Sequence, residues 1–124
     1  MKALSYLLIL FIASSTGASD RQKISSIEGV VTLNTTLHLA GVTVGVDGLA
    51  RGEHIQGNTD GSGYYLFAEV RPGAYSMWAD AKGYGCILIP RIAVHYDERV
   101  RQDFNFVRGK AYGACEAFEK KKRK

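Results

Sequence analysis

Apolar residues along this chain fall into short runs that alternate with polar residues or consist largely of β-branched side chains. Residues 42–46 and 74–80 alternate with period two, and residues 64–67 form a compact aromatic run. Glycine-rich turn signals separate the runs, and no helical period appears among them. The pattern predicts seven strands at intervals of about 8 to 14 residues and therefore an all-β sandwich. The expected strands are 27–33, 42–46, 54–59, 64–67, 74–80, 86–94 and 100–107.

The start of the chain has a different pattern. Lys2 is followed by an apolar run over residues 3–13, and small residues then surround a cleavage point after Ala18. The run is shorter than the roughly 20 residues that a membrane-spanning helix needs. We therefore expect residues 1–18 to be a cleaved signal peptide rather than an anchor, and the protein to be secreted or periplasmic.

Two cysteines, Cys86 and Cys115, would enter an oxidising compartment if the chain is exported. We expect them to form one internal disulfide. Two unpaired thiols, or a bridge to a second chain, are the alternatives.

The net charge of +4 is unevenly distributed. Residues 110–124 hold six basic and two acidic side chains, whereas residues 19–109 hold nine basic and ten acidic ones. A near-neutral body argues against a nucleic-acid surface spread over the fold. The basic tail, residues 109–124, either contacts an anionic surface or is a solvated terminus; its candidate binding residues are Lys120, Lys121, Lys122, Arg123 and Lys124.

Residues 58–69, NTDGSGYYLFAE, have the oxygen and glycine spacing of a helix-loop-helix calcium loop. Such a loop needs a helix on each side, but glycines precede it and Pro72-Gly73 follows Glu69. Asp60-Gly61 and Gly63 instead favour a hairpin turn. We therefore expect a turn and no metal site.

Five short motifs occur in an order and spacing that resemble the carboxypeptidase regulatory-like domain. They are G-x-V at 29–31, a small-residue turn into V-x-V at 39–44, T-D-x-x-G-x-Y at 59–65, V-x-P-G-x-Y at 70–75 and G-Y at 83–84. The resemblance covers about residues 25–108. It implies a seven-stranded Greek-key sandwich of transthyretin-like type, and this fold alone does not define a function.

The family pattern also implies which way the side chains point. Tyr65, Phe67, Val70, Tyr75, Met77 and Ala79 would face the core, while Tyr64, Leu66, Ser76, Trp78 and Asp80 would face outward. A single tryptophan on an outer face indicates either an interface or a sugar-stacking platform, unless the tail covers it or it lies flat among its neighbours. Tyr64 and Trp78 are therefore the candidate binding residues of the body.

Other candidate chemistry is weaker. His95 and Glu98 have an H-x-x-E spacing, but two ligands do not make a zinc site. Resemblance to the 5-hydroxyisourate hydrolases would need histidines gathered in a groove, from among His38, His54 and His95, and their Tyr-Arg-Gly-Ser terminus, which is missing here. A Lys–Asn isopeptide would have to join Asn105 to Lys23. Asn34-Thr35-Thr36 is a glycosylation triplet in a eukaryotic host.

Together these patterns predict a small exported, non-enzymatic module that binds or scaffolds a protein or glycan partner. It needs no cofactor, does not span a membrane and does not bind nucleic acid. Pairing of edge strands between copies would give a homodimer. The alternatives are a small hydrolase of the 5-hydroxyisourate type, and a binder of carbohydrates or anionic surfaces through Trp78 and the basic tail.

Overall fold

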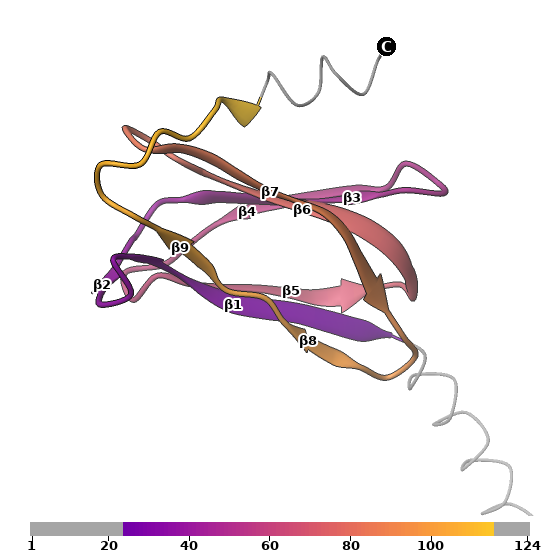
Figure 1. The fold of residues 1–124 in the computed structure, drawn as a ribbon. Coiled ribbons are helices and arrows are strands. Elements are labelled where there is room, and N and C mark those ends of the chain that lie inside the picture. Colours follow the sequence, from indigo (N-terminus) through magenta and orange to yellow (C-terminus); the bar gives the residue numbers. More distant parts are fainter. Residues whose placement is uncertain (1–23, 116–124) are drawn as a thin grey trace, which may run out of the picture.

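The computed structural model describes residues 24–115 as nine strands in two sheets stacked as a sandwich (Figure 1). The first sheet is built around β1 (Ser25–Leu33). At Ile27 and Glu28 this strand pairs with β5 (Tyr64–Val70) and with β8 (Arg99–Arg101), and at Thr32 and Leu33 it pairs with β2 (Leu37–His38) and β9 (Phe104–Phe106). The pairings with β2 and β5 are antiparallel, and those with β8 and β9 are parallel.

The second sheet has four antiparallel strands in the order β4-β3-β6-β7. Their bounds are Thr43–Gly48 for β3, His54–Asn58 for β4, Gly73–Ala81 for β6 and Gly85–Val94 for β7. The pairing of β6 with β7 is irregular between Tyr75, which pairs with Ile92, and Met77, which pairs with Ile89. In this stretch β7 has one residue more than β6, and Pro90 lies within it. Proline is compatible with this position, since β7 is an edge strand and carries the irregularity there.

The core lies between the two sheets, as the alternation of side chains requires. All six side chains expected to face inward are buried: Tyr65, Phe67, Val70, Tyr75, Met77 and Ala79. Phe104 and Phe106 join them, and Val100 packs against the same cluster. Tyr65 donates its hydroxyl proton to the carbonyl of Gln102, and burial raises the pKa of this phenol.

One of the five side chains expected to face outward does not reach solvent. Ser76 is fully buried, although it alternates with the inward-facing Tyr75 and Met77. It lies on a central strand opposite Asp47 and two residues from Trp78. A serine is short enough to be covered by larger neighbours on the same face, which alternation alone cannot reveal.

The strand count differs from the predicted seven. The run at 100–107 forms two strands, β8 and β9, because residues 102–103 leave the ladder. The Asp103 carboxylate accepts the Val30 N–H at 2.8 Å, so a side chain replaces one backbone acceptor. The two-residue strand β2 was not predicted either. The Greek-key wiring and the transthyretin-like arrangement stay predictions.

The expected hairpin at 59–63 is a crossing between the sheets, and a second crossing follows β7. The turn at 59–63 joins β4 to β5, and the turn at 95–98 joins β7 to β8. In the first, Asp60 Oδ1 accepts hydrogen bonds from Ser62 N, Ser62 Oγ and Tyr64 N at 2.8–3.0 Å. These bonds, that from the Ser62 hydroxyl foremost, lower the pKa of Asp60. The predicted turn is confirmed, but the predicted pairing of its two arms is wrong.

The described part of the C-terminal tail packs against the sandwich. Cys115 forms the expected disulfide with Cys86, and Cys86 N donates to Gly113 O at 2.7 Å. Tyr112 packs edge-on against Phe106 with ring centroids 5.1 Å apart. The packed domain therefore continues past the expected boundary at residue 108, at least to Cys115.

Within residues 24–115 no helix has the length and apolarity needed to cross a membrane. The expected signal peptide at 1–18 and the five cations at 120–124 lie outside the described residues.

Candidate binding surface

Trp78 lies on the outer face of the second sheet, directly over Gly45 of the neighbouring strand. Val44 and Val46 point into the core, so Gly45 faces outward beneath the indole. A Cβ at Gly45 would come within 2.2 Å of the indole atoms Cε2 and Cζ2. Only a residue without a side chain leaves this space, and it allows the ring to lie flat on the sheet.

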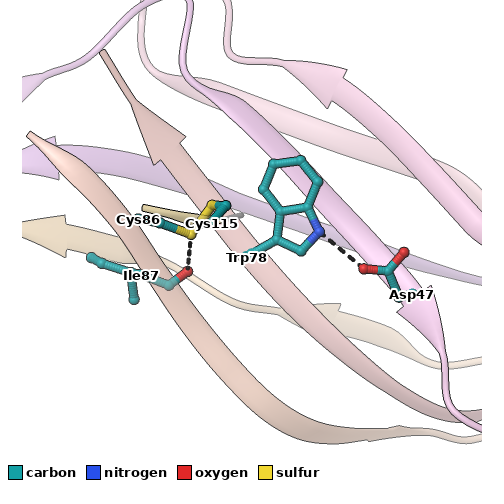
Figure 2. Close-up of a disulfide and its surroundings, with 5 residues drawn as sticks. All are labelled: Asp47, Trp78, Cys86, Ile87 and Cys115. Carbon is teal, nitrogen blue, oxygen red and sulfur yellow. Dashed lines mark hydrogen bonds between the residues drawn. A yellow bond between two sulfur atoms is a disulfide. The ribbon is translucent and has the colours of Figure 1, made fainter. Parts of the chain in front are cut away.

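Asp47 fixes the orientation of the indole (Figure 2). Trp78 Nε1–H donates to Asp47 Oδ2 at 3.0 Å. The other carboxylate oxygen, Oδ1, lies 2.5 Å from His54 Nδ1. Since an ionised carboxylate only accepts, Nδ1 of His54 carries the proton of this bond. One side chain thus holds two ring N–H groups from two different strands.

The imidazole of His54 extends the surface next to the indole. The two ring planes are within 19° of each other, and their centroids are 6.5 Å apart, so the rings are offset rather than face to face. Gln56 Oε1 lies 3.0 Å from His54 Nε2. On the neighbouring strand β7, Leu88 is the register partner of Trp78. We call Trp78, Asp47, His54, Gln56 and Leu88 the Trp78 surface.

The Trp78 surface combines a fixed aromatic plane with polar groups at its edge. An aromatic plane stacks on flat, partly apolar groups, and the adjacent carboxylate and amide can exchange hydrogen bonds with hydroxyl groups. Such a surface can bind a sugar ring or an extended peptide.

Tyr64, the other candidate residue, lies on the opposite outer face. It alternates with the buried Tyr65 on β5, so it points away from the core of the first sheet. Its hydroxyl donates to Glu28 Oε1 at 2.8 Å, and this bond raises the pKa of Tyr64. Leu66 beside it is 50% exposed. The two candidate aromatic residues therefore cannot contribute to one site.

A shallow pocket of about 380 Å³ opens where the C-terminal segment meets the turn between β6 and β7. Asp80, Lys82, Tyr84, Tyr112 and Cys115 are among its lining residues. Asp80 points to the same face as Trp78 and is paired in register with Cys86. The pocket thus adjoins the Trp78 surface at the disulfide.

The three histidines lie apart and have separate partners. His38 on β2 is 2.6 Å from Ser62 O, His54 on β4 contacts Asp47, and His95 precedes the turn between the sheets. Among residues 24–115, no group of three His, Cys, Asp or Glu side chains could hold a metal ion. Glu98 caps the turn itself, accepting the His95 N–H at 2.8 Å.

Two asparagines singled out by the sequence have structural partners. Asn105 Oδ1 accepts from Thr32 Oγ1 and from Thr35 N, while Lys23, its expected isopeptide partner, lies outside the described residues. Asn34 occupies a left-handed turn position and its Oδ1 accepts the Arg108 N–H at 3.0 Å. Its Nδ2 is the atom that a glycan would need, and this bond does not use it.

Sequence reasoning found Trp78 and named His54 only for the hydrolase alternative, and it missed Asp47 and Gln56 beside the indole. Asp47 precedes Gly48, and this pair reads as a turn signal, yet it belongs to β3 and pairs with His54. Folding residues 43–58 as a hairpin with Asp47 opposite His54 would have brought both to one edge. The strand pattern of residues 54–59 is weak, so it does not predict which of these residues lies opposite Asp47.

The structure is a two-sheet β-sandwich, and comparisons with known proteins agree on this fold. The model of the carboxypeptidase regulatory-like domain matches residues 26–107. The chain belongs to this family, as its five motifs indicated. No curated protein matches the chain by sequence.

Solved structures share the fold at low sequence identity. A candidate carbohydrate-binding protein from Bacteroides uniformis matches with a TM-score of 0.53 and 16% identity, covering 66% of this chain and 40% of that one. A chain of a type II cohesin–X-dockerin complex from Acetivibrio cellulolyticus matches at 0.52 and 18%, covering 66% and 56%. Catechol 1,2-dioxygenase from Acinetobacter radioresistens matches at 0.53 and 12%, covering 77% and 59%. This chain spans less than two thirds of each, and the likeness concerns the sandwich alone.

Proposed function

We propose that this protein is an exported, non-enzymatic binding module, and that its Trp78 surface binds a glycan. The observation that carries the proposal is the indole plane held flat over Gly45 by its hydrogen bond to Asp47. A ring fixed before the ligand arrives loses little side-chain entropy on binding, so its stacking energy contributes to affinity. A sugar ring presents a flat face of C–H groups and hydroxyls at its rim, which match this plane and its polar edge.

Two further observations support a binding role. Two solved structures with a similar sandwich, the candidate carbohydrate-binding protein from Bacteroides uniformis and a chain of a cohesin–X-dockerin complex, are in keeping with such a role. The separation of His38, His54 and His95 gives the hydrolase alternative no shared cleft among the described residues. A glycan is preferred to a protein partner because the surface is narrow and is built around one aromatic plane.

Export is part of the proposal. The expected signal peptide at 1–18 would bring the chain to an oxidising compartment, and the disulfide between Cys86 and Cys115 would persist there. The mass of the purified mature protein tests this, since cleavage after Ala18 predicts a chain that begins at Ser19.

The experiment for the binding role compares two single aromatic removals on opposite faces. Affinity electrophoresis through gels containing soluble β-glucan, xylan, alginate or heparin would be run on the wild type, Trp78→Ala and Tyr64→Ala. We expect retardation by at least one polysaccharide, weakened about tenfold or more by Trp78→Ala and unchanged by Tyr64→Ala. No retardation by any polysaccharide, or equal loss in both variants, would contradict the proposal.

A further inference from the structure

β4 is an edge strand of the second sheet, since it pairs with β3 and with no other strand of residues 24–115. Backbone hydrogen bonds at the two ends of this pairing run from Gly48 N to Glu53 O and from Thr59 N to Val42 O. Hydrogen-bonded pairs recur at every second residue of an antiparallel ladder. The residues of β4 that bond β3 are therefore the odd-numbered ones, and the even-numbered ones direct their N–H and C=O groups to the free edge.

The even-numbered residues of β4 are His54, Gln56 and Asn58, and all three are exposed. Within residues 24–115, the backbone N–H and C=O groups of Gln56 and Asn58 have no hydrogen-bond partner. The strand pairs with β3 without a register shift, and it contains no proline, lysine or arginine. It is thus a regular edge with free donors and acceptors, which is the feature that lets a strand pair with another chain.

The other edge strands of the described residues each carry a protective feature. β7 contains Pro90, with an irregular pairing there, and Cys86 N at its start donates to Gly113 O. On β5, Tyr64 N donates to Asp60 Oδ1, and the pairing with β1 has a register shift at the far end of the strand. β8 and β9 have three residues each, and β2 has two. Prolines, bulges and short strands keep edges from pairing, so β4 is the edge suited to accept a further strand.

β4 is complementary to itself when two copies pair antiparallel about Gln56. The Gln56 amide, which has both a donor and an acceptor, then lies opposite the same amide, and His54 lies opposite Asn58. No carboxylate or ammonium group faces a like charge, which would destabilise the pair. On the inner face, the partly buried Ile55 lies opposite Gly57 of the second copy, which has no side chain to clash with it.

From this complementarity we infer that β4 is a dimer interface and that its occupant is a second copy of this chain, related by a two-fold axis at Gln56. The two four-stranded sheets then form one sheet of eight strands, with both Trp78 surfaces on the same face. Five strand spacings separate the two β6 strands, so the two indoles lie about 24 Å apart. One polymer can contact both, which raises its apparent affinity. The dimer goes beyond the proposed function and does not depend on it.

Sedimentation velocity of the mature chain, from about 5 to about 500 μM, measures the equilibrium between monomer and dimer. A single strand pair is a small interface, so we expect the wild type to pass from monomer to dimer within this range. Gln56→Pro removes an edge N–H without touching the bonds to β3, and it should weaken dimerisation at least about tenfold. Leu88→Pro is the matched control on the opposite edge of the same sheet, since Leu88, like Cys86, directs its N–H away from β6. It should dimerise as the wild type does.

A charge exchange tests the two-fold axis itself. Gln56→Lys and Gln56→Glu each place like charges opposite one another, so each variant alone should dimerise at least about tenfold more weakly than the wild type. A mixture of the two should recover dimerisation, because opposite charges then meet across the axis. Near-ultraviolet circular dichroism checks that each variant is folded.

Three results would overturn the inference. A wild type that stays monomeric at every concentration would leave the edge to an extended peptide of another protein. Equal dimerisation of the wild type and Gln56→Pro would place the interface elsewhere on the molecule. No recovery in the mixture of Gln56→Lys and Gln56→Glu would exclude an axis at Gln56. Each of these results would leave glycan binding by the Trp78 surface standing, since that is measured separately by gel retardation.

Discussion

The two outer faces of the sandwich each carry one prominent aromatic residue, but the backbone beneath the two rings differs. On the second sheet, the register neighbour of Trp78 is Gly45, which leaves room for the indole to lie flat. On the first sheet, the register neighbour of Tyr64 is Val30, which has a β-branched side chain where Gly45 has none. A glycine on a central strand thus leaves room for an aromatic ring over the backbone, and a β-branched residue leaves less.

The polar ends of the two rings differ as well. The Trp78 N–H shares the Asp47 carboxylate with His54, which ties two strands together at the platform. Tyr64 uses a rotatable hydroxyl to contact Glu28, and the nearby Arg99 and Arg101 act on it only through their charges. The second face is therefore fixed in position and the first is a mixed polar surface. Matched substitutions on the two faces test this distinction.

The disulfide should have the largest effect, because it ties β7 of the second sheet to the segment that follows β9 of the first sheet. In the chain-entropy model, closing 29 residues stabilises the fold by about 3.5 kcal/mol. The double variant Cys86→Ala, Cys115→Ala should lower the free energy of unfolding by roughly that amount, measured by urea denaturation. The wild type in reducing agent should match the double variant. Equal midpoints for the oxidised wild type and the variant would show that the C-terminal segment does not stabilise the sandwich.

Glycine-to-alanine changes on the two sheets should differ in size. At Gly29 on β1, a Cβ would lie 1.9 Å from the carbonyl oxygen of Gln102, a backbone atom that cannot move away alone. We expect Gly29→Ala to destabilise by about 3 kcal/mol. At Gly45 the clash is with the indole, which can rotate out, so Gly45→Ala should cost about 1 kcal/mol.

The Gly45→Ala variant should lose glycan binding far more than stability, because the ring no longer lies flat. Thermal melts and gel retardation on the same samples check both parts. If Gly45→Ala proves as destabilising as Gly29→Ala, the indole is locked in the fold and is not a surface platform.

Removal of the Asp47 carboxylate should have a smaller effect on stability. Asp47→Ala deletes the acceptor of the Trp78 N–H and the partner of His54, which should cost about 1 kcal/mol. Its clearest readout is the emission of the single tryptophan, which should shift to longer wavelength as the indole becomes more hydrated. Glu28→Ala on the first face is the matched control, since it removes the acceptor of Tyr64 and should leave that emission unchanged.

These residues also show how far the sequence could carry the prediction. The family resemblance identified the six inward side chains of β5 and β6, and alternation then assigned their neighbours to the outer face, because burial on one face enforces period two. Alternation failed at Ser76, where neighbouring side chains rather than strand direction decide exposure. Turn residues were recognised at 59–63, but whether a turn closes a hairpin or crosses between sheets depends on pairings made elsewhere. Trp78 was identified because it is a rare residue type at an outward position. Its partner Asp47 was missed because Asp47-Gly48 resembles a turn.

The smallest effect concerns Asp60, at the turn that crosses from the Trp78 face to the Tyr64 face. Hydrogen bonds from Ser62 and Tyr64 hold its folded pKa below the usual value of 3.8. A lowered folded pKa contributes stability that is present above the unfolded value and is lost as pH falls through the folded one. The melting temperature of the wild type should therefore exceed that of Asp60→Asn at pH 6 and converge with it as the solution is acidified below about pH 4. The side chain is solvent-exposed, so the difference should be small and should leave binding through Trp78 unchanged. A constant gap between the two melting curves from pH 6 to pH 2 would show that Asp60 acts through its shape alone and that its charge does not stabilise the crossing.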